Sequence, residues 1–347
     1  MNYAIILAGG IGSRFWPLST DSEPKQFLKV SSDKPMIEET LQRIKGIIKK
    51  ENIYIAANKS HKQNILNYAR KFNIPLRNLL FEPESRNTFA PIAFLSQKIL
   101  SYDNDAAISV LPCDHVIKYA RKFIKCLSQA YKISETGNIV CFGIIPKRAE
   151  TGYGYIKIKK PETKNQKIQI YDIERFIEKP NLAKAKEFIK DKRFFWNSGI
   201  FIFKAKTLLE EIRRLFPDTS KYLMSNEPLN SLWVKLPDIS IDYAVMEKTK
   251  KIVLMPVDYG WIDLGSWQAI EEVLKKDKNN NIFRGNNIID LNTKNTIIWG
   301  NKRLIATVGI KDIIIVDTDN AILVCAKDKT QDVKKIAYKI NKLKSQN

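Results

Sequence analysis

Short aliphatic runs alternate with stretches of helical periodicity through the first part of the chain, and this rhythm limits the folds available to it. The runs cover residues 4–8, 53–57, 79–81, 107–112 and 139–144, and the periodic stretches cover 60–72, 88–102 and 119–135. Nearly continuous aliphatic strands joined by helices are typical of a parallel sheet with helices on both faces. We therefore expect an α/β fold with a doubly wound, mostly parallel sheet, which binds ligands at the carboxyl ends of its strands.

The pattern changes after the asparagines at 279–281. Aliphatic clusters then recur every eight or nine residues, near Ile288, Ile297, Ile305, Ile314 and Ile322. This spacing predicts a small β-rich domain like a left-handed β-helix, closed by a helix over about 331–343. We expect a larger domain at 1–278 and a small one at 282–347, the latter serving structure or oligomerisation.

A formal net charge of +21 is compatible with nucleic acid, anionic membranes or small anionic substrates. The lysines are spread along the whole chain, and no basic-aromatic module of the kind found in RNA-binding sheets is present, which disfavours nucleic acid. No apolar run approaches the roughly 20 residues that a membrane span needs. The four cysteines contain no C-x-x-C pair, so we expect reduced thiols in a soluble, cytoplasmic protein that binds neither nucleic acid nor membrane.

The first strand runs directly into a glycine-rich loop, A-I-I-L-A-G-G-I-G-S-R-F-W-P-L-S at residues 4–19. A dinucleotide fingerprint starting at Gly10 needs glycine where Phe15 stands, and a Walker A loop needs a Gly-Lys-Ser/Thr sequence that is absent, so both motifs are excluded. What remains is a backbone cradle for an anion at Gly9, Gly10 and Gly12.

Two cations follow this cradle. Arg14 offers a planar fork for bidentate contact with phosphate, and Lys25 offers a mobile point charge. Pro17 and Pro24 disfavour helix between them, which predicts an ordered loop folded back over bound phosphates. A plain turn with surface cations is the alternative interpretation.

Two aspartates follow predicted strands and suit a metal that prefers hard oxygen ligands. Asp114 comes just after the run 107–112, and Asp263 lies in G-W-I-D-L-G. Both positions are probable strand ends, where ligands of such sheets gather. From the residues alone, the alternative for Asp114 is a helix N-cap or turn residue, and the alternative for Asp263 is a turn residue before Gly265.

Eight motifs follow one another along the chain. They are G-G-I-G-S-R-F-W-P-L-S with P-K-Q-F-L, E-P-E-S-R-N-T (82–88), L-P-C-D-H (111–115), E-T-G-Y-G-Y-I (150–156), F-I-E-K-P (176–180), W-N-S-G-I-F (196–201), S-I-D-Y-A-V-M-E-K (240–248) and G-W-I-D-L-G-S-W (260–267). In this order they resemble the motifs of the sugar-nucleotide pyrophosphorylases, and specifically of the mannose-1-phosphate guanylyltransferases in their short, single-activity form.

This resemblance implies that mannose 1-phosphate attacks the α-phosphorus of GTP, giving GDP-mannose and pyrophosphate. It implies Mg²⁺, or Mn²⁺, held by Asp114 and Asp263, catalytic roles for Arg14 and Lys25, and a homodimer. A sugar phosphate is mostly dianionic near neutral pH, with a second pKa of about 6, so no side chain has to deprotonate it. Another base or hexose is the alternative within this class, and a basic nucleic-acid-binding protein is the alternative outside it.

The resemblance also divides the remaining site residues into two groups. For the sugar phosphate, Glu178 would accept from hydroxyls and Lys179 would meet the phosphate, while Asn197 can donate and accept. The sugar group is completed by Gly152, Tyr153 and Gly154. For the nucleotide, guanine presents donors at N1 and N2 that call for acceptors, so we expect Glu82 or a nearby backbone carbonyl to read the base. The nucleotide group is completed by Leu7, Ala8, Gly9, Gly10, Gly12, Ser13, Arg86, Asn87 and Thr88.

Overall fold

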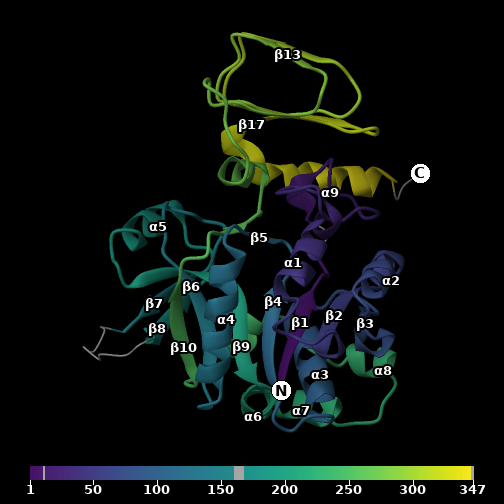
Figure 1. Cartoon of the computed structure of the whole chain (residues 1–347), viewed down its shortest axis with the longest axis vertical. Helices are drawn as coiled ribbons and strands as arrows, with labels where there is room; N and C mark the ends of the chain where they lie inside the picture. The colour runs from purple at the N-terminus through teal and green to yellow at the C-terminus, as the bar shows by residue number, and fades with distance from the viewer. Residues whose placement is uncertain (11, 160–167, 345–347) are drawn as a thin grey trace. The chain divides into compact units, whose positions relative to one another are not determined.

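The computed structural model describes residues 1–10, 12–159 and 168–344. They form two compact units, each assembled from separate stretches of chain (Figure 1). Residues 1–9, 40–113 and 117–261 form the sheet unit, and residues 10–39, 114–116 and 262–347 form the coil unit. The predicted domain ranges, 1–278 and 282–347, follow the order of the chain and stay a prediction.

The sheet unit is built on a nine-stranded sheet of order β3-β2-β1-β4-β9-β6-β10-β8-β7. Its strands are β1 (Asn2–Leu7), β2 (Ile53–Asn58), β3 (Leu79–Glu82), β4 (Ala107–Pro112), β6 (Ile139–Ile144), β7 (Tyr155–Ile158), β8 (Tyr171–Ile177), β9 (Phe194–Lys204) and β10 (Ile252–Val257). Strands β3, β2, β1 and β4 run parallel, as do β6 and β10, whereas β9 lies antiparallel to β4 and β6. The predicted mostly parallel α/β sheet is confirmed.

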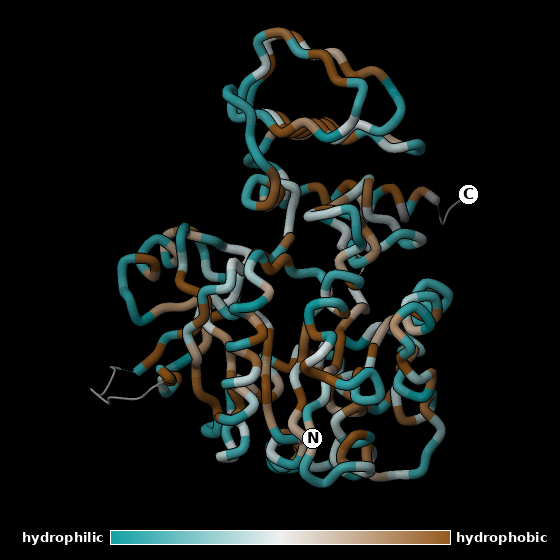
Figure 2. Tube along the Cα trace, in the orientation of Figure 1, coloured by the Kyte–Doolittle hydropathy of each residue, from teal (hydrophilic) through white to brown (hydrophobic). Residues whose placement is uncertain are grey.

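The central strands are buried on both faces, as their uninterrupted aliphatic runs predict. Ala4, Ile5 and Ile6 of β1 have no exposed surface, and β6 is buried along its whole length. Figure 2 shows hydrophobic residues concentrated along the strands of the sheet and hydrophilic residues in the connecting loops.

Helices follow most strands of the sheet unit. They are α2 (Lys62–Lys71), α3 (Phe89–Leu100), α4 (Ala120–Ser134), α5 (Leu182–Phe188), α6 (Ala205–Leu215), α7 (Pro217–Leu223) and α8 (Leu229–Trp233), while α1 (Met36–Ile44) contains residues of both units. α4 packs against β4, β6 and β9, and α6 packs against α3. The helices cover the sheet because one face of each amphipathic helix carries its apolar residues.

The coil unit stacks short strands at the spacing that its sequence predicts. They are β12 (Ile282–Arg284), β13 (Ile288–Leu291), β14 (Ile297–Trp299), β15 (Ile305–Val308), β16 (Ile313–Asp317) and β17 (Ile322–Ala326). β12, β14 and β16 pair in parallel, and so do β13 and β15, which is the pattern of a β-helix. Helix α9 (Val333–Lys344) follows, so the predicted β-rich domain and terminal helix are confirmed.

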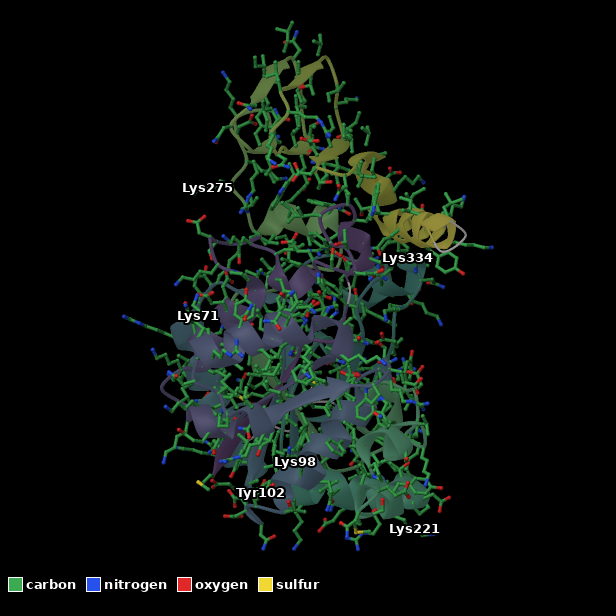
Figure 3. All side chains as sticks on the ribbon, turned by 90° about the vertical axis from the view of Figure 1, so that its right-hand side faces the viewer. Lys71, Lys98, Tyr102, Lys221, Lys275 and Lys334 are labelled. Carbon is green, nitrogen blue, oxygen red and sulfur yellow. The ribbon has the colours of Figure 1, made fainter. Side chains whose placement is uncertain are left out.

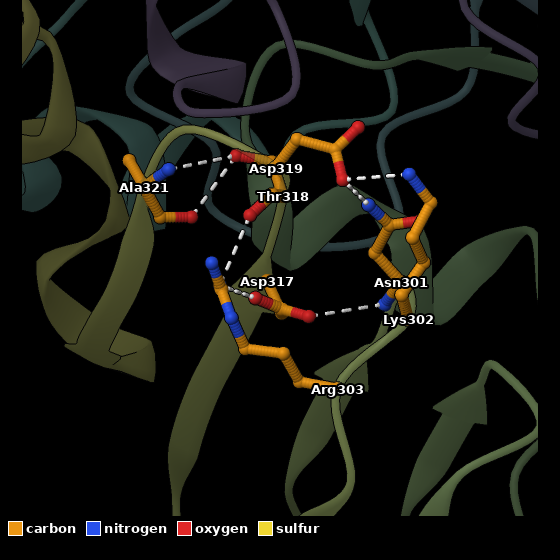
Figure 4. Close-up of polar contacts among 7 residues, drawn as sticks. All are labelled: Asn301, Lys302, Arg303, Asp317, Thr318, Asp319 and Ala321. Carbon is orange, nitrogen blue, oxygen red and sulfur yellow. Dashed lines mark hydrogen bonds and ion pairs between the residues drawn. The ribbon is translucent and has the colours of Figure 1, made fainter.

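Polar side chains join successive turns of this coil (Figure 4). Asp317, only 3% exposed, pairs with Arg303 and accepts from the backbone N–H of Asn301. Asp319 accepts from the Asn301 amide at 3.0 Å and from Lys302 at 3.1 Å. Buried polar atoms need such partners, so the network stabilises the stacking where the apolar core ends.

The core of the coil unit also contains residues of the glycine-rich segment. Phe15 is 1% exposed and its ring lies 5.0 Å from that of Trp267, which in turn lies 5.7 Å from Trp299. The Trp267 indole N–H donates to the Trp16 carbonyl at 3.1 Å. The segment after the glycines is therefore fixed by aromatic residues that follow it by some 250 positions in the chain.

Candidate active site

Gly12 has a conformation and surroundings that only glycine satisfies. Its φ is 75°, in the left-handed region, and a Cβ built there would lie 2.4 Å from the Cβ of Lys25. The Ser19 hydroxyl donates to the Gly12 carbonyl at 2.8 Å. Directly after it, Ser13–Phe15 form a single 3₁₀ turn, η1. The loop is thus held in a compact shape by its own neighbours.

Arg14 lies at the centre of η1, between the constrained Gly12 and the buried Phe15. Its Nε is buried and has no hydrogen-bond partner among the residues that the structure describes. An unsatisfied buried donor on a cation is costly unless a ligand meets it. The arrangement suits a bound anion such as a phosphate group.

Lys25 joins the two predicted metal ligands within the coil unit. Its ammonium lies 2.9 Å from a carboxylate oxygen of Asp114 and 3.6 Å from one of Asp263. The Lys25 side chain is 6% exposed, whereas the two aspartates are 38% and 27% exposed. Two acids from distant parts of the chain thus meet on one buried cation.

The charge balance at this cluster keeps Asp114 ionised. Burial raises the pKa of the Asp114 carboxyl, but the Lys25 ammonium, with help from His115, lowers it well below its ordinary value. The His115 Nε2 lies 3.9 Å from Asp114. Asp114 is therefore a carboxylate throughout the neutral range and can bind a cation.

Asp114 and Asp263 fit a divalent metal bound through few protein ligands. Across the described ranges, no group of three or more His, Cys, Asp or Glu side chains could hold a metal by itself. Magnesium is commonly held by one or two carboxylates, with waters and substrate phosphates completing the shell. An oxygen of Asp114 and an oxygen of Asp263 lie 2.9 Å and 3.6 Å from the same ammonium group, so the two carboxylates are near one positive charge.

Within the sheet unit, Glu82 stands beside the end of the first strand. A Cβ on Gly9 would lie 3.1 Å from a Glu82 carboxylate oxygen, and Glu82 is 6% exposed. Burial raises the pKa of Glu82 to about 7, although the backbone N–H of Arg86 opposes this rise. Leu7 ends β1, and the Ala8 N–H donates to the Ala56 carbonyl at 2.8 Å. A buried acceptor thus lies where the sequence predicts the base.

The other residues predicted for the nucleotide make contacts that shape their own loop. The Arg86 guanidinium binds the Glu84 carboxylate and the Leu236 carbonyl. The Thr88 hydroxyl accepts from the backbone N–H of Ile241 at 2.9 Å. Asn87, at a φ of 45°, accepts from the Thr88 N–H. Contacts of these three residues with a nucleotide stay a prediction.

Four of the residues predicted for the sugar phosphate meet in the sheet unit. The Lys179 ammonium lies 2.8 Å from Glu178, and a Cβ on Gly154 would lie 2.6 Å from the other Glu178 oxygen. The Asn197 N–H donates to the Gly154 carbonyl at 2.8 Å. Gly152 and Tyr153 precede Gly154, and the Tyr153 ring lies 5.3 Å from those of Trp196 and Trp261.

One polar residue at this cluster had no role in the sequence prediction. Asp242 accepts from the Asn197 side-chain amide at 2.6 Å and begins a π-helical turn, Asp242–Met246. Burial raises the pKa of Asp242, and the nearby Glu178 adds to this effect. The available signal was an acid inside the apolar stretch S-I-D-Y-A-V-M, because an acid among buried residues needs a partner.

The positive charge of the chain is distributed over both units. Lys71, Lys221, Lys275 and Lys334, labelled in Figure 3, are exposed and come from both units. In the described part of the chain, no helix has the length and apolar character needed to cross a bilayer.

Two family models match the chain. Residues 3–280 match the nucleotidyl transferase family, and residues 286–340 match the "MannoseP isomerase/GMP-like beta-helix domain". A solved structure described as a mannose-1-phosphate geranyltransferase of Thermus thermophilus superposes with a TM-score of 0.89 at 30% identity, covering 98% of this chain and 99% of that one.

Curated relatives match the chain over nearly all of its length. Mannose-1-phosphate guanylyltransferase 2 of Escherichia coli O157:H7 is 38% identical, with 96% of this chain and 72% of the relative covered. Mannose-1-phosphate guanylyltransferase of Escherichia coli K12 is 35% identical, with 97% and 73% covered. With its glycine loop, its paired aspartates and its β-helix, the chain belongs to the family of the mannose-1-phosphate guanylyltransferases, which work with a divalent metal.

Proposed function

We propose that the chain makes GDP-mannose and pyrophosphate from GTP and mannose 1-phosphate. The observation that carries this proposal is the meeting of Asp114 and Asp263 on Lys25, in the unit that also holds Arg14 with its unsatisfied Nε. Such a cluster suits transfer between phosphates, which depends on positioning and charge neutralisation.

The reaction needs no side chain as a base. An oxygen of the sugar phosphate forms a bond to the α-phosphorus of GTP, and the bond from that phosphorus to the oxygen leading to the β-phosphate breaks. The electron pair of the broken bond leaves with pyrophosphate. Because the attacking phosphate is already mostly a dianion at neutral pH, given a second pKa of about 6, the enzyme has to hold two anions together.

We assign the charged residues of the coil unit to the triphosphate. Arg14 offers its guanidinium, whose Nε has no partner among the described residues, to the departing phosphates, and Gly10, Gly12 and Ser13 offer backbone N–H groups. Asp114 and Asp263 would hold Mg²⁺ or Mn²⁺, which would supply positive charge to the phosphate oxygens. Lys25 keeps the two carboxylates together and supplies a positive charge beside them.

We assign the residues of the sheet unit to the base and the sugar. Glu82 accepts from the guanine N1 and N2 donors beside Gly9 through the ionised form of its carboxyl, which predominates above about pH 7. Glu178 accepts from mannose hydroxyls, and Lys179 moves from Glu178 to the sugar phosphate. An unpaired buried carboxylate disfavours a base without donors at that edge, which accounts for guanine over adenine.

We also propose a cytoplasmic homodimer that forms through the coil unit. Supporting this, Ile289 and Leu291 of β13 and Val308 of β15 are about 60% or more exposed on adjacent strands. An exposed apolar strip of this kind is typical of a protein–protein interface. The cytoplasmic compartment is supported by the absence of disulfides among the four cysteines, all of which the structure describes.

Pyrophosphate release tests the proposed reaction. The full chain is incubated with Mg²⁺ and each pairing of GTP, ATP, CTP or UTP with mannose 1-phosphate or glucose 1-phosphate. We expect GTP with mannose 1-phosphate to give the largest kcat/KM. A different preferred pair would establish the alternative specificity, and no release from any pair would refute the assignment.

A further inference from the structure

Asn197 is the last paired residue of β9 before a bulge that lies between it and Phe201. Asn197 pairs with Gly143 of β6, but the register shifts before Phe201 pairs with Cys141. Gly199, at a φ of 66°, allows the chain to bend there. Bulges commonly re-aim a side chain beside an active site, and this one places Asn197 against the loop of Gly154.

The side-chain amide of Asn197 makes most of its hydrogen bonds with other groups of the protein. Its oxygen accepts from the Gly199 N–H at 2.9 Å and from the Cys141 thiol at 3.6 Å. Its nitrogen donates one hydrogen to Asp242 at 2.6 Å. An amide nitrogen has two hydrogens, so within the described residues one donor remains for a ligand. Asp242 determines where that donor points, because turning the amide over would bring its oxygen against the carboxylate.

Asp242 is held firmly by the segment that precedes it. The Ile241 N–H donates to Thr88, the Ile239 carbonyl accepts from the Phe89 N–H, and the Trp233 indole donates to the Glu84 carbonyl. Asp242 itself accepts at its backbone carbonyl from the Glu247 N–H at 2.9 Å. Because this segment is anchored, Asp242 has a fixed position and can orient the Asn197 amide.

We infer that Asp242 is a positioning residue for sugar-phosphate recognition, acting through Asn197: it orients the amide so that the second N–H meets a mannose hydroxyl. The inference rests on the proposed function. A positioned donor improves binding because the side chain has already lost its freedom before the ligand arrives.

A double-mutant cycle tests whether Asp242 acts through Asn197. KM for mannose 1-phosphate and KM for GTP are measured for the wild type, Asp242→Ala, Asn197→Ala and the double variant. We expect Asp242→Ala to raise KM for mannose 1-phosphate about tenfold, the loss expected for a charge-assisted hydrogen bond, with KM for GTP within about twofold. In the Asn197→Ala background, Asp242→Ala should alter KM for mannose 1-phosphate less than about twofold.

Two further variants separate positioning from general effects. Asp242→Asn keeps the shape and an acceptor oxygen, so we expect it to restore most of the affinity. Glu135→Gln removes the charge of an exposed carboxyl on the same unit, and it should leave both KM values unchanged. If Asp242→Ala is poorly folded, the cycle is run with Asp242→Asn, whose smaller effect should also vanish without Asn197.

The outcomes are distinguishable. Equal effects of Asp242→Ala with and without Asn197 overturn the inference, and so does an equal rise in KM for GTP. If the wild type releases no pyrophosphate from GTP and mannose 1-phosphate, the proposed function fails instead.

Discussion

The buried Glu82 carboxyl leads to a prediction about stability as well as specificity. Its pKa is raised from an ordinary value of 4.5 to about 7, because burial disfavours the charged form. The folded state therefore binds a proton more tightly than the unfolded state. Stability contributed by the protonated group is present below about pH 4.5 and is lost as the pH rises through about 7.

The size of this loss follows from the pKa. At about 1.4 kcal/mol for each pKa unit, the rise from 4.5 to about 7 corresponds to roughly 3 kcal/mol at pH 8. Glu82→Gln removes the titrating group and keeps its volume, so the variant should not lose this stability. We expect the variant to be more stable than the wild type by up to about 3 kcal/mol at pH 8, and the difference to shrink at pH 5.

Urea unfolding at pH 5 and pH 8, followed by tryptophan fluorescence, measures the difference. Glu135→Gln, which changes an exposed carboxyl on the same unit, is the matched control and should show no such pH dependence. The Glu82→Gln variant should also lose preference for GTP over ATP by at least about tenfold in kcat/KM, since the guanine donors lose a charged acceptor. Identical pH profiles for wild type and variant would refute the burial argument, and an unchanged base preference would remove Glu82 from the base pocket.

Three other substitutions test separate parts of the proposed site by pyrophosphate release. Gly12→Ala should lower kcat/KM at least about tenfold, because a methyl group 2.4 Å from the Lys25 Cβ displaces the loop or the lysine; activity within twofold of wild type would contradict this. Asp263→Asn should raise the Mg²⁺ concentration for half-maximal rate about tenfold, and an unshifted titration would exclude it as a ligand. Lys179→Ala should raise KM for mannose 1-phosphate about tenfold, whereas a fall in kcat alone would argue against phosphate contact.

The fold could be predicted where local pattern and burial agree. The runs at 4–8, 107–112 and 139–144 became buried strands because a continuous aliphatic segment is stable only with both faces covered. The antiparallel β9 was not predicted, since its residues F-F-W-N-S-G-I-F-I-F do not show which neighbours they pair with or in which direction. Which strands pair depends on the packing of the whole sheet, and the sequence around Gly199 contains no reliable signal for a bulge.

The residue types of the candidate site could be predicted from the sequence, but the contacts between these residues could not. Asp114 and Asp263 follow strands, as expected, yet their meeting on Lys25 depends on packing between distant segments. Lys25 was predicted to act as a mobile charge for phosphate, and the structure shows it buried between carboxylates; contact with phosphate stays a prediction. Asp242 was missed because its importance lies in a contact with Asn197, which no spacing along the chain reveals.

The coil unit is assembled from separate stretches of chain, and this affects how the protein folds during its synthesis. The glycine-loop segment packs against Trp267 and Trp299, which are translated some 250 or more positions after it. Joining such remote stretches is slow, and until it happens Phe15 and its neighbours are not covered by these aromatic rings. A nascent chain can therefore form its sheet before its phosphate-binding loop is ordered, and catalysis should begin only after Trp267 and Trp299 have been added to the chain.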